Sequence, residues 1–161
     1  MPASTLEILS KKWEDSNELF CKIANTSRLA NLYLNVFDGD ISVQLAPTSE
    51  MSLVFEIRTQ KTLDLYMKRY PTAKDEPEER IPFFVFDASL KGEKYYSVAM
   101  ANNYLDTELI WKFASKYLLD NPEHIICLNR EVFIDSKRMK KIVSTTEYTK
   151  DWCFKLNDLQ D

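Results

Sequence analysis

Few residues in this sequence have the types and the spacing that active-site chemistry requires. His124 is the only histidine, and it lies three residues before Cys127. The pair could supply two metal ligands, but a zinc site needs four, so we interpret Cys127 as a small apolar residue of a strand. Gly39 and Gly92 are the only glycines, which excludes a phosphate-binding loop, a dinucleotide fingerprint and a strained serine nucleophile. We therefore expect neither a metal nor a cofactor.

Asp40 and Glu56 are the carboxylates that could most readily form a catalytic pair. Glu56 lies in the apolar segment 53–57, two residues before Arg58. Nucleases of the restriction type use a similar order, in which two carboxylates hold Mg²⁺ and a lysine sits beside the attacking water. Arg58 stands in the place of that lysine and does not shed a proton at neutral pH. The same residues also fit a turn and the solvated side of a strand, so a Mg²⁺-dependent nuclease is kept as an alternative.

The segment between Pro71 and Pro82, called here the acidic segment, is the main candidate for contact with another protein. Its carboxylates are Asp75, Glu76, Glu78 and Glu79. A loop of this length without structure of its own is unusual in a compact domain, and such loops are often functional. We expect it to face a basic surface of a partner protein, because complementary charge speeds association. We expect Tyr95 and Trp152 to be exposed rings that anchor the same partner.

The chain has one basic cluster, in the segment 136–143. Its cations are Lys137, Arg138, Lys140 and Lys141. We predict a helix here that begins after Asp135, with Met139, Ile142 and Val143 as its buried stripe. The cations then form the solvated side of the helix. The net charge of −4 has the wrong sign for a general nucleic-acid-binding protein, so we expect no nucleic-acid partner.

The periodicity of the apolar residues predicts the first elements of the chain. Ser4 and Glu7 have the spacing of a capping box, and Leu6 and Leu9 follow at helical spacing. We therefore predict an N-terminal helix, which Leu19, Phe20 and Ile23 continue after a break at Asp15-Ser16-Asn17. Alternating residues on both sides of Asp38-Gly39-Asp40 then predict a β-hairpin, because Asp-Gly between such segments is a strong hairpin signal.

The later segments predict a sheet with further helices. We expect strands at 51–57, 83–86, 95–100, 125–128, 132–134 and 148–156, and helices at 63–70, 110–118 and 136–143. There is no internal repeat and no domain boundary. The chain is thus predicted to be a single α+β domain over residues 1–161, with an N-terminal helix followed by a mostly antiparallel sheet and helices packed on one face.

The expected order over residues 4–119 is helix, three strands, helix, two strands, helix. That order is similar to the order in type III secretion chaperones; the similarity is in element order alone, and residues 120–161 depart from it. It implies a protein that holds a partner protein. We favour another form of the same activity, an immunity or antitoxin-like protein that neutralises a toxin, because no dimerisation feature is visible in the sequence.

The remaining features bear on the cellular compartment. Cys21, Cys127 and Cys153 are an odd number and lie far apart, which favours reduced, buried thiols over a disulfide framework. The first residues lack the basic and apolar regions of a secretory signal, and no apolar run approaches the ~18 residues that span a bilayer. We therefore expect a non-catalytic, cytoplasmic, bacterial protein that binds another protein and no membrane.

Overall fold

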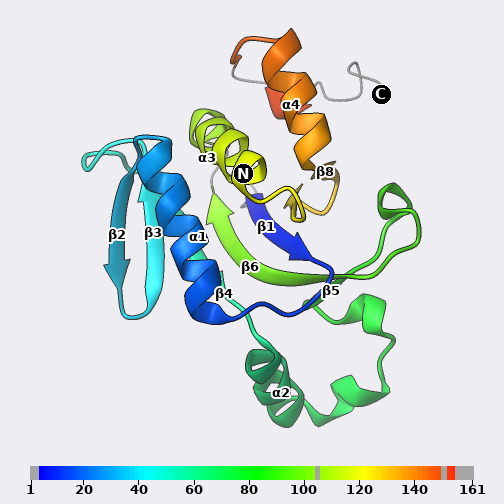
Figure 1. The fold of residues 1–161 in the computed structure, drawn as a ribbon. Helices are drawn as coiled ribbons and strands as arrows, with labels where there is room; N and C mark the ends of the chain where they lie inside the picture. Colours follow the sequence, from blue (N-terminus) through cyan, green and yellow to red (C-terminus); the bar gives the residue numbers. More distant parts are fainter. Residues whose placement is uncertain (1–3, 104–105, 150–151, 155–161) are drawn as a thin grey trace.

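The computed structural model describes residues 4–103, 106–149 and 152–154, and a sheet of eight strands runs through it (Figure 1). The strands are β1 (Ser4–Ser10), β2 (Tyr33–Phe37), β3 (Asp40–Gln44), β4 (Leu53–Ile57), β5 (Phe84–Val85), β6 (Tyr95–Asn103), β7 (Ile125–Leu128) and β8 (Val132–Ile134). The helices are α1 (Ser16–Leu29), α2 (Gln60–Arg69), α3 (Thr107–Asp120) and α4 (Ser136–Thr145). The fold belongs to the expected α+β class.

The sheet is antiparallel, with the strand order β2-β3-β4-β6-β1-β7-β8. The short strand β5 pairs with β6 beside this path. The first strand of the chain therefore lies inside the sheet, between β6 and β7, while β2 and β8 form its two edges.

Three of the helices share one core. Leu19 of α1, Phe113 of α3 and Met139 of α4 belong to a single buried cluster with Ile8 of β1. Figure 1 shows α1 and α3 in front of the sheet, α4 above α3 at the top of the view, and α2 below the sheet. Leu63 of α2 belongs to a separate, smaller cluster at that end of the molecule.

The N-terminal helix is predicted wrongly over residues 4–10, which form strand β1, whereas its expected continuation over residues 19–23 lies in α1. Leu6 and Ile8 enter the main core, whereas Leu9 belongs to a second cluster that also contains Val85 and Cys127. The strand is thus buried on both faces, and apolar residues on both faces imitate helical spacing. Glu7 caps no helix, because its side chain is buried in the sheet.

The predicted hairpin is confirmed as β2 and β3. Asp38 and Gly39 have φ values of 49° and 84°, the left-handed conformation that a two-residue turn of this kind requires. Tyr33 pairs with Gln44 and Phe37 with Asp40, in one unbroken register. The strand predicted at 51–57 and the helices predicted at 63–70, 110–118 and 136–143 are also present, with bounds that differ by a few residues.

Two later predictions need correction. The acidic segment is not without structure, because the 3-10 turns Pro71–Asp75 and Glu78–Arg80 lie in it. In the segment expected to be the last strand, Trp152–Phe154 forms a 3-10 turn, and residues 150–151 and 155–156 lie outside the described residues. No helix in the described part of the chain has the length and apolarity needed to cross a membrane.

Candidate functional site

The two carboxylates of the nuclease alternative are neighbours in the sheet. The register between β3 and β4, continued by one step, places Asp40 beside Glu56, and both are exposed. Arg58 is near Glu56, whose charge raises its pKa, but Arg58 is buried and donates hydrogen bonds to the Ser97 hydroxyl and the Pro82 carbonyl. Within the described residues, no group of three His, Cys, Asp or Glu side chains could hold a metal ion. In the described part of the chain the carboxylate pair thus has no third metal-ligating side chain, and the guanidinium of Arg58 is engaged in hydrogen bonds inside the protein.

Arg58 belongs instead to a buried ionic cluster around Glu7. The Glu7 side chain is 2% exposed, and Arg130 binds it in a bidentate manner, with Nε 3.0 Å from Oε2 and Nη2 2.9 Å from Oε1. The Ser97 hydroxyl donates to Glu7 Oε1 at 2.8 Å, and Arg58 Nη1 lies 4.0 Å from the same oxygen. Burial lowers the pKa of Arg58, although the nearby carboxylates raise it.

The ionic cluster holds the segment before β5 against the sheet. Arg130 Nη2 donates to the Pro82 carbonyl at 2.7 Å, and Arg58 Nη1 donates to the same carbonyl at 3.2 Å. The guanidinium of Arg58 also lies 5.1 Å from the centre of the Phe83 ring. Every polar group of Glu7 thus serves a contact inside the protein, so we assign the cluster a structural role.

A second buried chain of polar groups runs through the only histidine. His124 Nε2 lies 2.5 Å from Glu14 Oε1, and Nδ1 lies 2.9 Å from the Tyr117 hydroxyl. Burial alone would raise the pKa of Glu14, but the hydrogen bond and charge of His124, with Lys22, hold it below its usual value. Burial raises the pKa of Tyr117. His124 and Tyr117 are both 0% exposed, so they connect the start of α1 with α3 and do not form an open reaction site.

The acidic segment is exposed, but half of its predicted contact residues are paired within the protein. Glu76 Oε2 lies 3.6 Å from Arg80 Nη1, and Glu78 Oε2 lies 3.1 Å from Lys94 Nζ. Asp75 and Glu79 are also exposed. The segment therefore presents a weaker negative field than its composition suggests.

Tyr95 and Trp152 are buried, so neither is the exposed anchor that we expected. Tyr95 is 7% exposed and belongs to the cluster of Leu9 and Cys127. Trp152 is 4% exposed, its Nε1 donates to the Thr107 carbonyl at 2.8 Å, and its ring packs edge-on against Trp111. Both rings pack inside the core of the protein.

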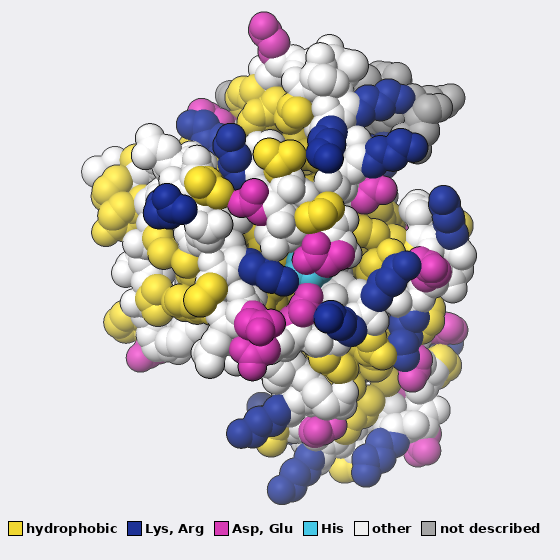
Figure 2. All heavy atoms as spheres, in the orientation of Figure 1, with side chains coloured by type: hydrophobic (Ala, Val, Ile, Leu, Met, Phe, Trp, Pro, Cys, Tyr) yellow, Lys and Arg dark blue, Asp and Glu magenta, His cyan; other side chains and the backbone are white. Residues whose placement is uncertain are grey.

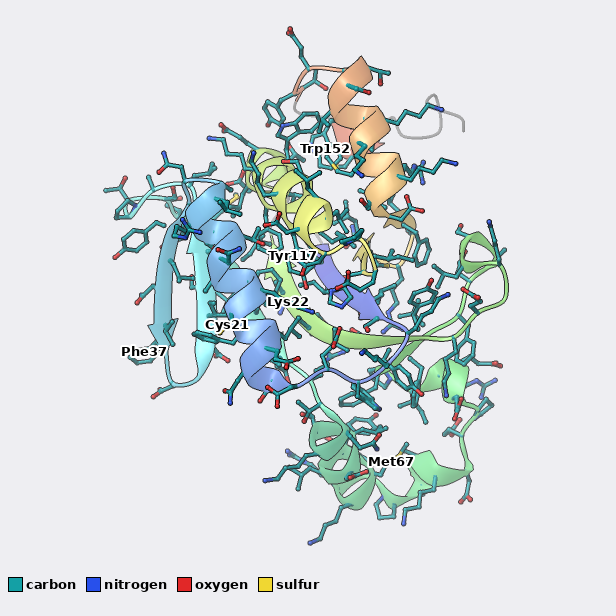
Figure 3. All side chains as sticks on the ribbon, viewed as in Figure 1. Cys21, Lys22, Phe37, Met67, Tyr117 and Trp152 are labelled. Atoms are coloured by element: carbon teal, nitrogen blue, oxygen red, sulfur yellow. The ribbon has the colours of Figure 1, made fainter. Side chains whose placement is uncertain are left out.

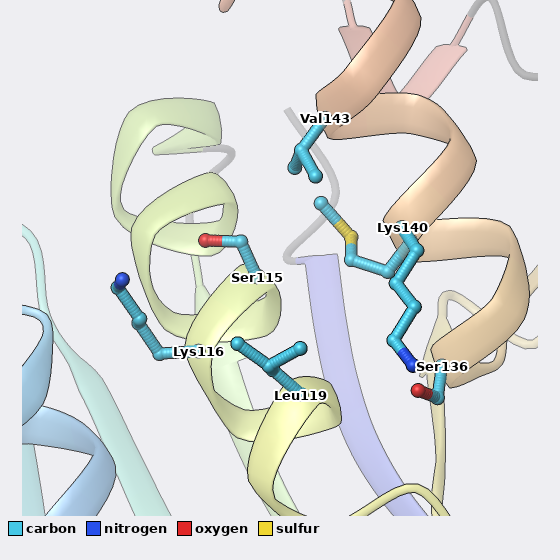
Figure 4. Close-up of a pocket in the computed structure, with 7 residues that line it drawn as sticks. Ser115, Lys116, Leu119, Ser136, Lys140 and Val143 are labelled. Carbon is cyan, nitrogen blue, oxygen red and sulfur yellow. The ribbon is translucent and has the colours of Figure 1, made fainter.

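A small pocket lies at the surface between α3 and α4 (Figure 4). We call it the α3–α4 groove, and it is lined by Ser115, Lys116, Leu119, Ser136, Met139, Lys140 and Val143. Its volume is about 210 Å³. Figure 4 shows Leu119 and Val143 directed into the gap from the two helices. These two side chains are 53% and 44% exposed, whereas Met139 beside them is buried.

The chemistry of the α3–α4 groove combines apolar contact with positive charge. Lys116 on α3 and Lys140 on α4 both line it, and Figure 4 shows the Lys116 side chain extending away from α4. The buried hydroxyl of Ser136 also lines the groove and has no hydrogen-bond partner in the described part of the chain. A bound group could therefore bury apolar surface and receive one hydrogen bond, with a carboxylate placed near either lysine.

The sequence pattern did not predict the α3–α4 groove, because the helical spacing placed Val143 in the buried stripe of α4. Met139 and Ile142 are buried as predicted, but Val143 is exposed. Leu119 follows the buried Leu118 and lies on the other side of α3. Adjacent apolar residues of a helix can both be buried, as Tyr117 and Leu118 are, so their spacing alone does not show that Leu119 and Val143 lie outside the core.

Comparison of the chain with protein-family models, with curated proteins and with solved structures found no match. We therefore argue the function from the geometry and chemistry of the α3–α4 groove and of the other surfaces described above.

Proposed function

We propose that this chain is a non-catalytic protein-binding module whose α3–α4 groove takes an apolar side chain from a partner segment that also carries acidic residues. The observation that supports the proposal is the exposure of Leu119 and Val143 on both sides of one pocket. Apolar anchors that fill a pocket supply most of the affinity in protein interfaces. The lysines Lys116 and Lys140 favour a carboxylate beside such an anchor, because opposite charges steer association and fix register.

The size of the α3–α4 groove favours a side chain over a cofactor. Pockets for small molecules commonly have about 300–1,000 Å³, and this groove has about 210 Å³. One large apolar side chain fits this space, and the rest of its segment would lie across the two helices. Met139 is flexible and polarisable, which suits contact with anchors of differing shape.

Two forms of this activity remain as proposals, neutralisation of a toxin and holding of a secreted protein. The order α1-β2-β3-β4-α2-β5-β6-α3 over residues 16–120 agrees with the order that is similar to type III secretion chaperones, although β1 precedes it. A groove that accepts a single anchor suits either form. Contact between the acidic segment and a basic surface of the same partner stays a prediction, with Asp75 and Glu79 as its exposed carboxylates.

A displayed library of random peptides tests the proposal directly. We expect selection on the protein to enrich peptides with a large apolar residue close to Asp or Glu. Their binding should fall at least tenfold with Leu119→Glu or Val143→Glu, and also with the charge-reversal variant Lys116→Glu/Lys140→Glu. The matched control is Leu65→Glu on α2, because Leu65 is 58% exposed and lies outside the groove. Peptides that bind all the variants equally, or a library without enrichment, would refute the assignment of the groove.

The nuclease alternative has its own test. Purified protein is incubated with DNA or RNA and Mg²⁺, and we expect no cleavage above that of a Glu56→Ala preparation. Cleavage that Glu56→Ala abolishes while the fold is retained would overturn the non-catalytic proposal.

A further inference from the structure

The two edges of the sheet are protected to different degrees. At one edge, β8 has three residues, of which Phe133 and Ile134 are buried, and α4 follows it directly. At the other edge, β2 has five residues, of which four are exposed. Proteins usually protect such an edge with a lysine, a proline or a bulge. Tyr33–Phe37 contains no charged residue and no proline, and its register with β3 is unbroken.

Exposed apolar side chains surround this open edge. Phe37 is 74% exposed, Val36 48% and Tyr33 43%. Figure 3 shows Phe37 directed away from the hairpin, and Figure 2 shows hydrophobic side chains gathered over the hairpin and α1. An uncharged strand edge with apolar residues on both of its faces is suited to pairing with another strand.

The backbone of β2 offers hydrogen bonds at defined positions. In an antiparallel ladder, every second residue turns its N–H and C=O away from the neighbouring strand. Phe37 and Asp40 flank the two-residue turn and form a hydrogen-bonded pair. Hydrogen-bonded and non-hydrogen-bonded pairs then alternate along the hairpin, so the N–H and C=O groups of Leu34 and Val36 point away from β3. An incoming strand must therefore form its hydrogen-bonded pairs with Leu34 and Val36.

We propose that β2 pairs with β2 of a second copy of this chain, antiparallel, with Asn35 opposite Asn35 on a two-fold axis. The strand reads Tyr-Leu-Asn-Val-Phe and is symmetric in chemical type about Asn35. In this register Leu34 of each copy lies opposite Val36 of the other, so the two hydrogen-bonding residues meet. Tyr33 lies opposite Phe37 on the other face, and such aromatic cross-strand pairs stabilise sheets. Isologous pairing of this kind closes at two copies.

The charge of the chain is compatible with this pairing. Two molecules of net charge −4 repel each other, but the proposed seam contains no charged residue. The nearest carboxylates, Asp38 and Asp40, lie beyond Phe37 at the turn and do not oppose each other in this register. The β2 edge is thus a place where two copies can meet without opposing like charges.

The exposed area indicates a weak dimer. An aromatic side chain carries about 150–250 Å², so Phe37 and Tyr33 together offer on the order of 200 Å² per copy. With Val36, Leu34 and the backbone, two copies bury roughly 800–1,000 Å², below the ~1,200 Å² of standard interfaces. We therefore expect a dimer that forms in the micromolar range and depends on concentration.

The dimer would carry two binding sites. The α3–α4 groove lies at the end of the sheet that bears β8, and β2 lies at the opposite end (Figure 1). Pairing through β2 leaves both grooves open, so a partner with two suitable segments would bind with higher avidity. The dimer proposal does not depend on the proposed function, because its observations concern the edge alone.

Analytical ultracentrifugation from low micromolar to near-millimolar concentration tests the dimer. We expect the weight-average mass of the wild type to rise toward that of two chains. The variant Val36→Lys should stay monomeric, while Val54→Lys should behave as the wild type. Val54 is the matched control, because it is a strand valine with 43% exposure that lies inside the sheet on β4. A wild type that is monomeric throughout, or a dimer unaffected by Val36→Lys, would overturn the proposal.

A cross-linking experiment tests the register and does not rely on Val36→Lys folding correctly. In a Cys21→Ser background, Asn35→Cys places two thiols at a non-hydrogen-bonded pair, where the Cα atoms are about 4.5 Å apart and a disulfide can form. Ser42 pairs with Asn35 inside the hairpin, so Ser42→Cys is the control. Its two thiols would be about 14 Å apart, beyond disulfide reach. Equal cross-linking of the two variants, or none in either, would refute the register.

Discussion

The Glu7→Gln substitution is the most direct test of the buried ionic cluster. Glutamine keeps the size of the side chain and removes its negative charge. Arg130 then loses its bidentate carboxylate, and Arg58, whose side chain is 8% exposed, keeps only the exposed Glu56 as a nearby carboxylate. Arg58 Nε already has no hydrogen-bond partner in the described part of the chain.

The expected cost follows from the burial of each partner. Removing one member of a buried ion pair typically costs about 3–5 kcal/mol, because the remaining charge is left uncompensated. The Arg130 side chain is 39% exposed and regains some hydration, and Arg58 lies 4.0 Å from the carboxylate. We therefore expect Glu7→Gln to lower the free energy of unfolding by about 3 kcal/mol, the lower end of this range. For a chain of this size that corresponds to a fall in Tm of roughly 6–12 °C.

Urea unfolding measures the free energy of unfolding of Glu7→Gln, and Glu56→Gln is the matched control variant. Glu7 and Glu56 lie on the two sides of Met100 and both raise the pKa of Arg58, but Glu56 is exposed to water, so its loss should cost less than about 1 kcal/mol. In a double-mutant cycle, Glu7→Gln and Arg130→Met should couple by about 1–3 kcal/mol. A cost of Glu7→Gln equal to that of Glu56→Gln, or a cycle without coupling, would refute the reasoning.

Three further predictions concern Glu14, the thiols and the cap of α4. The pKa of Glu14 is lowered in the folded protein, so its contribution to the free energy of unfolding is present above pH ~4.5 and is lost as the pH falls. Urea unfolding measured across this pH range should therefore show a smaller loss of stability on acidification for Glu14→Gln than for the wild type. Burial raises the pKa of Cys127 to about 12, and Cys21 is exposed, so alkylation of the native protein followed by peptide mass analysis should find Cys21 modified and Cys127 intact. Asp135 accepts a hydrogen bond from the Arg138 N–H at 2.7 Å, so Asp135→Ala should cost about 1 kcal/mol in urea unfolding, and no loss would contradict the cap.

The elements that the sequence predicts correctly are those set by local chemistry. The hairpin follows from Asp38-Gly39, because few residues adopt the positive φ values that a two-residue turn needs. Helix α4 follows from Asp135 and the spacing of Met139 and Ile142. These signals lie within a few residues of one another, so no knowledge of distant contacts is needed to interpret them.

The exposure of individual side chains is harder to predict, because it depends on distant segments. Tyr95 is covered by Leu9 and Phe133, which lie far away in the sequence. Trp152 is buried because α3 supplies both Trp111 and a carbonyl acceptor. Alternation shows that adjacent residues of a strand face opposite sides, but it does not show which side another segment covers. The sequence therefore does not predict which side chains form the exposed candidate binding surface, and the three-dimensional fold is needed to identify them.

The position of strand β1 and the buried ionic cluster depend on each other. A strand inside a sheet is normally apolar on its buried faces, and Glu7 breaks this pattern in β1. The charge can stay there because Arg130 comes from the turn between β7 and β8, and Ser97 comes from β6, the two elements that flank β1. A helix over residues 4–10 would not hold the Glu7 carboxylate between these two donors. The misleading residue at the start of the chain is thus the one that ties β1 to its neighbours, and the measured cost of Glu7→Gln would report how firmly it does so.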